Sequence, residues 1–312
     1  MMDQLLDNTI KIFRLECPGL FKRIDNYTKV IMRAEDDIGY TKVDFADLCT
    51  FLEYIELREF GGGQRWSDNA SREKLALRFY LAKTIVNSMP APDDIPDLYI
   101  QFANELRQSD IVITFNWDPL LEIALTKVKK SFAYNNFGKA EIRIYKLHGS
   151  INWRVGLPCI SKNVWTPLGL TKGMMKDELY YCKEALYKNE WNGAKPLMGE
   201  LEPFLILPGA GKAYDVRAIA PIWYKPEDAF AVTHHVYIIG LSLSDDDFFV
   251  KSFFLDTLPD IDCFSGVPGR EITIINPDRK IVENYSFIKS RPRVNFVLEK
   301  FNADHVRQIR RT

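Results

Sequence analysis

Four runs of mostly β-branched and aromatic residues, at positions 111–115, 142–147, 236–239 and 272–275, constrain the fold of this chain most strongly. Strands of a parallel sheet that is buried on both faces have such nearly continuous apolar sequences. The carboxyl ends of parallel strands meet at one edge of a sheet, where open α/β proteins bind their ligands. Polar segments follow all four runs: Asn116-Trp117-Asp118, His148-Gly149-Ser150, Gly240-Leu241-Ser242 and Asn276-Pro277-Asp278. The pattern predicts an α/β fold in which these segments share one crevice.

Residues 1–108 have the periodicity of helices instead. Apolar residues recur at steps of four and three along one segment, and Pro90 ends that pattern. The segment Gly61-Gly62-Gly63 is interpreted as a loop and not as a phosphate cradle, because no predicted strand precedes it and no helix opens directly behind it. The apolar stripe consists of Leu75, Phe79, Ala82, Val86 and Met89, and a further helix is marked by Leu98, Phe102 and Leu106.

The alternation of strand, turn and helix begins at Asp110. We therefore predict two parts: a helical section, residues 1–108, packed on the sheet, and a Rossmann-like core, residues 109–312. Residues 154–200, with a helical pattern near 176–188, are predicted to be an insertion over the sheet, and further strands are predicted at 204–207 and 294–298. The expected fold class is α/β, with a mainly parallel, Rossmann-like sheet in a three-layer sandwich and a large N-terminal helical section.

Composition argues against several classes of partner. The 312 residues include 41 Lys and Arg and 42 Asp and Glu, so the net charge of −1 gives no general attraction to nucleic acid or to anionic membranes. The lysines at 127, 129 and 130 suit the end of a helix, and they do not indicate a nucleic-acid surface. No run approaches the length of a membrane helix, and no signal layout opens the chain. We expect a soluble, cytoplasmic protein.

The five cysteines lie far apart in the sequence, without a Cys-x-x-Cys pair. Zinc sites need closely spaced Cys and His ligands, and disulfide frameworks belong to oxidising compartments. The cysteines are therefore interpreted as reduced thiols, and no zinc is expected.

Asn116 and Asp118 share a tight turn between a strand and a helix. An amide in this position can orient a sugar hydroxyl or a water, and a carboxylate can accept hydrogen bonds from ribose. A structural alternative stays open, in which Asp118 only caps the helix that begins near Pro119 and Asn116 only stabilises the turn.

His148 follows a strand and precedes Gly149, which allows a close turn. An imidazole at a strand end is suited to act as a general base near neutral pH. A single histidine can equally be a structural residue, and its company with Asn116 favours the catalytic interpretation. His234, His235 and His305 have no comparable position.

The turn after residues 236–239 contains Gly240 and Ser242, and Ser244 or Asp245 is predicted to cap the helix that follows. Backbone amides and hydroxyls at such a turn can hold a ribose or a phosphate. The acidic run from Asp245 to Asp247 is explained by the dipole of that helix. No metal site is predicted there.

The four segments together resemble a known family. The order Phe-Asn-x-Asp, Leu-His-Gly-Ser, Ile-Gly-x-Ser-Leu-x-x-x-Asp and Ile-Asn-Pro-Asp is similar to that of the sirtuin-like NAD-hydrolase domains of bacterial antiphage defence systems, over about residues 110–300. The resemblance implies that Asn116 orients ribose and water and that His148 is the general base. It implies that Asp118 lies near the nicotinamide, and that Gly240, Ser242, Asn276 and Asp278 line the adenosine half. The zinc-binding cysteines of deacylating sirtuins are missing.

One motif of that family is not found. The family opens with a strand and a Gly-Ala-Gly-x-Ser type of loop that binds the pyrophosphate, whereas the pattern of Leu5, Leu6, Ile10 and Phe13 predicts the helix that would follow such a loop. Two alternatives stay open: a start that lies further upstream, or a chain that naturally lacks this loop.

The resemblance implies an enzyme that consumes NAD as a substrate and releases nicotinamide and ADP-ribose. It also implies an assembly, either with copies of the chain or with a partner protein of a defence system. The alternative from another class is a catalytically impaired nucleotide-binding or scaffold subunit of a defence complex.

Overall fold

The computed structural model describes residues 2–31, 45–57, 71–135, 141–155, 165–170, 178–182, 196, 202–209, 212–243, 247–258, 271–289 and 293–311. The fold is mixed α/β and divides into two compact units, each assembled from separate segments. Unit 1 contains the described residues of Met1–Asp94, Thr114–Ile123 and Lys146–Ala218. Unit 2 contains those of Ile95–Ile113, Ala124–Tyr145 and Ile219–Thr312. The predicted division into residues 1–108 and 109–312 stays a prediction.

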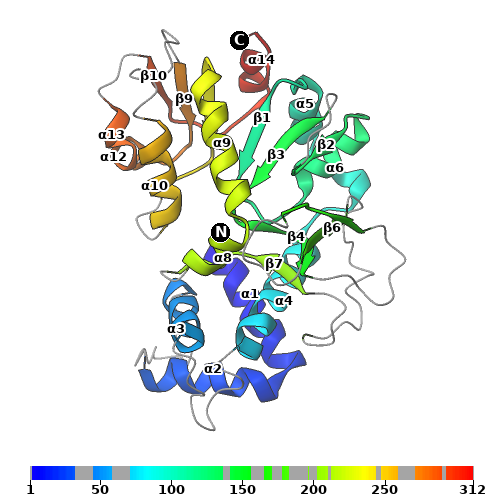
Figure 1. The fold of residues 1–312 in the computed structure, drawn as a ribbon, viewed down its shortest axis with the longest axis vertical. Coiled ribbons are helices and arrows are strands. Elements are labelled where there is room, and N and C mark those ends of the chain that lie inside the picture. Colours follow the sequence, from blue (N-terminus) through cyan, green and yellow to red (C-terminus); the bar gives the residue numbers. More distant parts are fainter. Residues whose placement is uncertain are drawn as a thin grey trace. The chain divides into compact units, whose positions relative to one another are not determined.

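Four helices open unit 1: α1 (Met2–Glu16), α2 (Pro18–Ile31), α3 (Phe45–Leu57) and α4 (Ser71–Ser88), drawn from blue to cyan in Figure 1. The predicted helix at 75–89 is confirmed as α4. This helix packs against the other three and is buried around most of its circumference, well beyond the predicted stripe. Phe13 of α1 stacks on Tyr80 of α4 with ring centroids 4.7 Å apart. Leu5, Leu6 and Ile10 also lie within α1.

Unit 1 also contains a four-stranded sheet with the order β5-β6-β4-β7. Its strands are β4 (Gly149–Val155), β5 (Trp165–Pro167), β6 (Leu179–Cys182) and β7 (Pro203–Leu205), and their pairings are antiparallel. The strand predicted at 204–207 is thus confirmed, in this antiparallel sheet. Helix α8 (Ala213–Ala218) follows it.

The helix expected near 176–188 is wrong for the described part of that range. Residues Leu179–Cys182 form β6, paired antiparallel with β4 on one side and β5 on the other. Leu179 and Cys182 are buried by this pairing, so tertiary contacts override the local helical pattern. Most of the predicted insertion at 154–200 lies outside the described residues.

A three-stranded parallel sheet lies in unit 2. It has the order β10-β9-β8 and consists of β8 (His235–Ile239), β9 (Glu271–Ile275) and β10 (Val294–Val297). Ile238, Ile274 and Ile275 are buried, whereas most other residues of β8 and β10 are half-buried. The strands predicted at 236–239, 272–275 and 294–298 are confirmed.

The other two predicted strands, at 111–115 and 142–147, are β1 (Ile111–Thr114) and β3 (Ile142–Lys146). They form a sheet of order β1-β3-β2 with β2 (Phe132–Ala133), which was not predicted. Strands β2 and β3 run parallel. Helix α6 (Leu120–Lys127) connects β1 to β2. Lys130 does bind a helix end, but that of the preceding helix α5 (Asp97–Glu105): its Nζ lies 2.6 Å from the carbonyl oxygen of Leu106.

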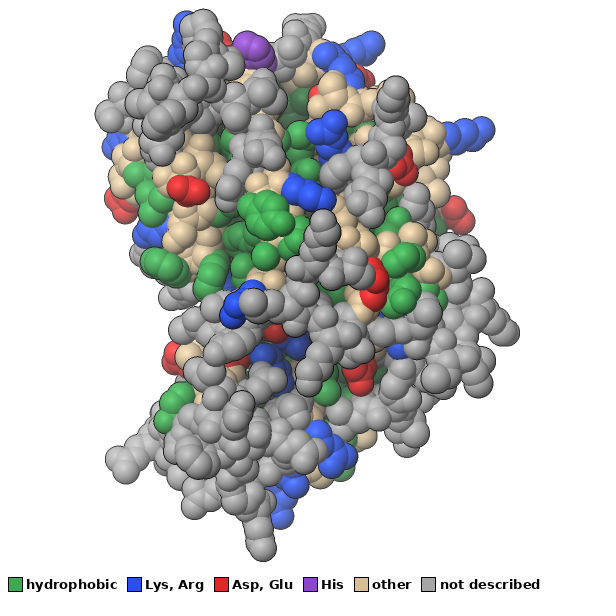
Figure 2. Space-filling model, viewed as in Figure 1, with side chains coloured by type: hydrophobic (Ala, Val, Ile, Leu, Met, Phe, Trp, Pro, Cys, Tyr) green, Lys and Arg blue, Asp and Glu red, His purple; other side chains and the backbone are tan. Residues whose placement is uncertain are grey.

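The remaining helices are α9 (Ala220–Val232), α10 (Phe248–Thr257), α12 (Ile281–Asn284), α13 (Ser286–Lys289) and α14 (Ala303–Arg311), together with a 3₁₀ turn at Pro92–Asp94. Aromatic contacts of Phe253 with Trp223 (6.1 Å) and Phe230 (5.8 Å) join α9 to α10. Figure 2 shows apolar side chains over these two helices, and Tyr224 and Phe248 are among the exposed ones.

The helix predicted from Leu98 to Leu106 is confirmed as α5, which packs against α14, and its Phe102 contacts Phe301 in the segment just before α14. Gly61 to Gly63 lie outside the described residues. In the part of the chain that is described, no helix combines the length and apolar character needed to cross a membrane.

Candidate functional site

The first candidate segment is the loop between β1 and α6. The backbone N–H of Asn116 donates to Oγ1 of Thr114 (3.1 Å), and the side chain of Asn116 is exposed. Oδ1 of Asp118 accepts a hydrogen bond from the backbone N–H of Leu120 (3.1 Å). Asp118 therefore caps α6, as the structural alternative predicted, and the residue is half-buried.

The second candidate segment follows β3. His148 is half-buried, its Nε2 atom is buried, and its ring meets the ring of Phe115 edge to face at 5.2 Å. The carbonyl oxygen of His148 accepts hydrogen bonds from Nε1 of Trp117 (3.1 Å) and from the backbone N–H of Ile206 (2.9 Å). The backbone of His148 is thus held from the first loop and from the segment after β7.

Further hydrogen bonds join these two segments. The N–H of Leu147 donates to the carbonyl oxygen of Thr114 (3.1 Å), so the carboxyl ends of β1 and β3 lie side by side. The carbonyl oxygen of Trp117 accepts from the N–H of Ile151 (3.0 Å) and from Oγ of Ser150 (3.1 Å). The structure therefore brings the loop that carries Asn116 and Asp118 together with the one that carries His148, within unit 1.

Gly149 is required by this arrangement. Its φ of +74° lies in the left-handed region, and a Cβ atom there would be 2.2 Å from the carbonyl oxygen of Phe204. The close approach that the sequence predicted at this glycine is an approach to the protein's own strand β7.

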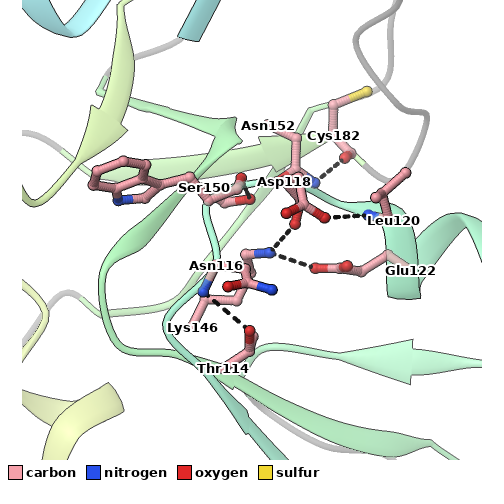
Figure 3. Close-up of polar contacts among 10 residues, drawn as sticks. Thr114, Asn116, Asp118, Leu120, Glu122, Lys146, Ser150, Asn152 and Cys182 are labelled. Atoms are coloured by element: carbon pink, nitrogen blue, oxygen red, sulfur yellow. Dashed lines mark hydrogen bonds and ion pairs between the residues drawn. The ribbon is translucent and has the colours of Figure 1, made fainter. Parts of the chain in front are cut away.

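Lys146 and Glu122 form a buried ion pair next to these loops, and the sequence interpretation missed both residues. Their side chains are 1% and 3% exposed, and Nζ of Lys146 lies 3.1 Å from Oε1 of Glu122. Lys146 also donates to the carbonyl oxygen of Asp118 at 2.6 Å (Figure 3). Strand β3 carries a second cation, Arg143, whose side chain is exposed, so no signal in the sequence singles out Lys146 as buried.

The polar face of β4 begins at Ser150, directly after the loop with His148. Ser150, Asn152 and Arg154 alternate along the strand and are all buried, and Nδ2 of Asn152 donates to the carbonyl oxygen of Cys182 (2.8 Å). Figure 3 shows Ser150 and Asn152 in one view with Asn116 and Asp118. The surroundings of the two loops are polar on this side.

The other predicted site residues lie in unit 2, at the carboxyl ends of β8 and β9. The N–H of Gly240 donates to the carbonyl oxygen of Ile275 (2.9 Å), so Gly240 and Asn276 lie at the same edge of the sheet. Gly240 has a φ of +70° and open space where a Cβ would be. The prediction that all four segments share one crevice stays a prediction.

Asn276 and Asp278 stabilise their own turn. Oδ1 of Asn276 accepts from the N–H of Asp278 (2.9 Å), and Oδ1 of Asp278 accepts from the N–H of Lys280 (2.9 Å). Asn276 is buried, while Asp278 is exposed. Of the two, Asp278 is the one whose side chain faces solvent.

The turn at Ser242 is held by its backbone. The carbonyl oxygen of Ser242 accepts from Nδ2 of Asn284 (2.6 Å), and that of Leu241 accepts from the hydroxyl of Tyr285 (3.3 Å). Burial raises the pKa of Tyr285 well above its ordinary value, so this donor keeps its proton at neutral pH. The Ser242 side chain stays exposed at the sheet edge.

The cap of α10 differs from the predicted one. Oδ1 of Asp247 accepts from the N–H of Val250 (3.2 Å), so Asp247 is the N-cap residue. The predicted caps, Ser244 and Asp245, lie outside the described residues. Among the residues that the structure describes, no group of three or more His, Cys, Asp or Glu is arranged to hold a metal ion.

Comparisons with known proteins give no relative from which a role could be transferred. No protein-family model matches the chain, and no curated protein or solved structure matches it significantly.

Proposed function

We propose that this chain hydrolyses the glycosidic bond between nicotinamide and ribose in NAD. One observation carries the proposal: the loop with the exposed Asn116 is hydrogen-bonded to the loop with His148, at the adjacent carboxyl ends of β1 and β3. An amide and an imidazole held at neighbouring strand ends are the pair that the reaction needs.

The chemistry follows from these two side chains. The bond between ribose C1′ and the nicotinamide nitrogen breaks, its electrons neutralise the pyridinium nitrogen, and positive charge develops at the ribose. Asn116 orients the ribose hydroxyls and one water, and the water oxygen bonds to C1′. His148 takes the proton that this water releases, so the products are nicotinamide, ADP-ribose and one proton.

The finer fold assignment belongs to the same proposal. We infer that the parallel strands of unit 2 belong to a Rossmann-like core in a three-layer sandwich. The parallel pairs β8-β9, β9-β10 and β2-β3 support this, as do the polar turns directly after β8 and β9. In this fold the adenosine half of a dinucleotide binds at such turns, which here carry Gly240, Ser242, Asn276 and Asp278.

A scaffold or nucleotide-binding subunit without turnover is the second candidate. It is favoured by the buried Nε2 atom of His148 and by the use of Asp118 as a helix cap, because both are ordinary structural roles. Such a subunit would bind NAD through the adenosine half alone. The resemblance of the motifs to defence proteins suggests the same setting for both candidates: an antiphage assembly with further copies or with a partner protein.

Nicotinamide release separates the two candidates. The purified chain is incubated with NAD, and nicotinamide and ADP-ribose are quantified by chromatography while NAD binding is measured by calorimetry. The hydrolase predicts equal amounts of both products, in catalytic excess over protein. Binding without any turnover, also in a form extended upstream or with its partner, would support the scaffold.

A further inference from the structure

We infer that Lys146 is a positioning residue that holds the loop with Asn116 and Asp118 in register with His148. The inference rests on the proposed function, because it says which interaction keeps that site assembled. Lys146 ends β3, two residues before His148, and its side chain reaches across to the other loop.

The contacts of Lys146 are short and lie out of solvent. Its Nζ donates to the carbonyl oxygen of Asp118 at 2.6 Å and lies 3.1 Å from Oε1 of Glu122. The side chain of Lys146 is 1% exposed and that of Glu122 is 3% exposed. Hydrogen bonds from a charged donor are among the strongest in proteins, and a low local dielectric strengthens them further.

The carbonyl oxygen of Asp118 is an effective point at which to fix this loop. It lies two residues after Asn116, and the carboxylate of the same residue caps α6. Glu122, in the first turn of α6, binds the same ammonium group. Lys146 therefore connects the end of β3, the loop with Asn116 and Asp118, and the start of α6, as Figure 3 shows.

This role differs from simple ion pairing. If the pair only balanced two buried charges, replacing both by neutral residues of similar size would be tolerated, as is often found for buried ion pairs. Losing the bond to Asp118 would still release the loop. A displacement of about 1 Å is enough to lower a rate about 100-fold.

Two variants isolate the bond to Asp118. Glu122→Gln alone keeps Lys146 and its hydrogen bond to the loop, but it removes one counter-charge of a buried ammonium, so its melting temperature is measured and its kcat is taken on folded protein only. Lys146→Met with Glu122→Gln removes that bond but leaves neither charge buried without its partner, which avoids the strong destabilisation of a single Lys146 variant.

A second ion pair in the same unit serves as the matched control. Nη1 of Arg23 in α2 lies 2.8 Å from Oε1 of Glu73 in α4, and the Glu73 side chain is fully buried. Arg23→Met with Glu73→Gln therefore changes the same chemistry without touching the loops. It reports the effect of losing a partly buried ion pair elsewhere in the unit, since the Arg23 side chain is 34% exposed.

Two readouts are taken on every variant of the full chain: kcat and KM for NAD, and amide hydrogen exchange. We expect Lys146→Met/Glu122→Gln to lower kcat about 100-fold with KM changed less than about threefold. We also expect exchange at residues 115–120 to rise about 10-fold, while exchange in α1 and α4 stays as in the wild type. Glu122→Gln alone and the Arg23/Glu73 control should keep kcat within about threefold of wild type.

Hydrogen exchange keeps this inference separate from the proposed function. Faster exchange at 115–120 in a protein that never turns over NAD would reject the hydrolase and keep Lys146 as the residue that holds the loop. Unchanged exchange at 115–120 in Lys146→Met/Glu122→Gln would overturn the inference. So would a kcat equal to that of Glu122→Gln alone.

Discussion

The indole Nε1 of Trp117 donates a hydrogen bond to the carbonyl oxygen of His148 at 3.1 Å, and so links two residues that are 31 positions apart. Trp117 is the residue between Asn116 and Asp118, and it is largely buried. Its own carbonyl oxygen accepts from Ser150 and Ile151. One side chain and one peptide group thus tie the two candidate loops to each other.

We expect Trp117→Phe to loosen this connection. The change removes the donor to His148 and should cost about 1 kcal/mol of unfolding free energy, measured by urea denaturation, and it should lower NAD turnover. Trp223→Phe is the control, because Trp223 is equally buried but packs in the aromatic cluster between α9 and α10. Equal losses of turnover in both variants would contradict a specific role for the Trp117 bond.

Two glycines with the same backbone conformation should respond differently to alanine. Gly149 has a φ of +74° and a carbonyl oxygen 2.2 Å from the position of a Cβ, whereas Gly240 has a φ of +70° and open space. Gly240→Ala should lower the free energy of unfolding only by the strain of the left-handed conformation, about 1–2 kcal/mol. Gly149→Ala must also displace β7 and should cost about 3 kcal/mol or more. Thermal unfolding of the two variants provides the comparison, and a Gly149→Ala protein as stable as Gly240→Ala would contradict the close approach to Phe204.

Asp215 should contribute to stability above acidic pH. Burial alone would raise the pKa of this carboxyl, but Arg78 and then Lys74 overcome that effect and lower the pKa below its ordinary value of 3.8. Arg78 bonds Asp215 directly, and Nζ of Lys74 lies 3.6 Å away. Because the folded pKa is the lower one, the stabilisation is fully present above the unfolded value and is lost as pH falls through the folded value.

Asp215→Asn should therefore destabilise the protein at pH 7 by about 3–5 kcal/mol, because a charge that interacts with two buried cations is removed. Melting temperatures are measured from pH 7 down to pH 2. The difference in melting temperature between the wild type and Asp215→Asn should shrink as the pH drops below about 4. A difference between the two that stays constant over this range would show that the charge of Asp215 is not what stabilises unit 1.

Metal chelators are expected to leave folding and NAD turnover unchanged. The sequence has no closely spaced Cys and His set, and the reaction proposed for Asn116 and His148 needs no Lewis acid. The check is a turnover assay after dialysis against EDTA, combined with elemental analysis. Stoichiometric zinc in active protein would refute this expectation.

The strands and the candidate loops could be predicted because their signals are local. Apolar runs ending in Asn116, His148, Gly240 and Asn276 mark strands and the turns behind them, and each run forms a strand in the structure. Burial on both faces of a sheet produces such runs directly, so no tertiary information is required.

The antiparallel sheet of unit 1 was harder to predict. Strand β4 alternates Ser150, Asn152 and Arg154 with Ile151 and Trp153, a period of two that is typical of a strand, although only the polar segment His148-Gly149-Ser150 was predicted here. Its partner β6 has no such signal, because Leu179–Cys182 becomes a strand only through pairing with β4 and β5. Pairing between distant segments cannot be derived from either segment alone.

The ion pair of Lys146 and Glu122 could not be predicted for a related reason. A lysine at the end of a strand and a glutamate in a first helical turn both normally face solvent. Only the three-dimensional arrangement buries both and directs Lys146 to the carbonyl oxygen of Asp118.

The central claim is that Asn116 and His148 carry out NAD hydrolysis, and single alanine variants test it most directly. Each matched control replaces an exposed residue of the same type away from the loops: Asn295→Ala for Asn116→Ala, and His234→Ala for His148→Ala. Far-UV circular dichroism and melting temperature confirm that the four proteins are folded. Turnover is measured as nicotinamide released from NAD at saturation.

The account predicts that Asn116→Ala and His148→Ala each release nicotinamide about 100-fold or more slowly than the wild type, that the melting temperature of Asn116→Ala is nearly unchanged, and that both controls are fully active. Wild-type rates in the two loop variants, or a wild type that binds NAD and releases no nicotinamide, would contradict it.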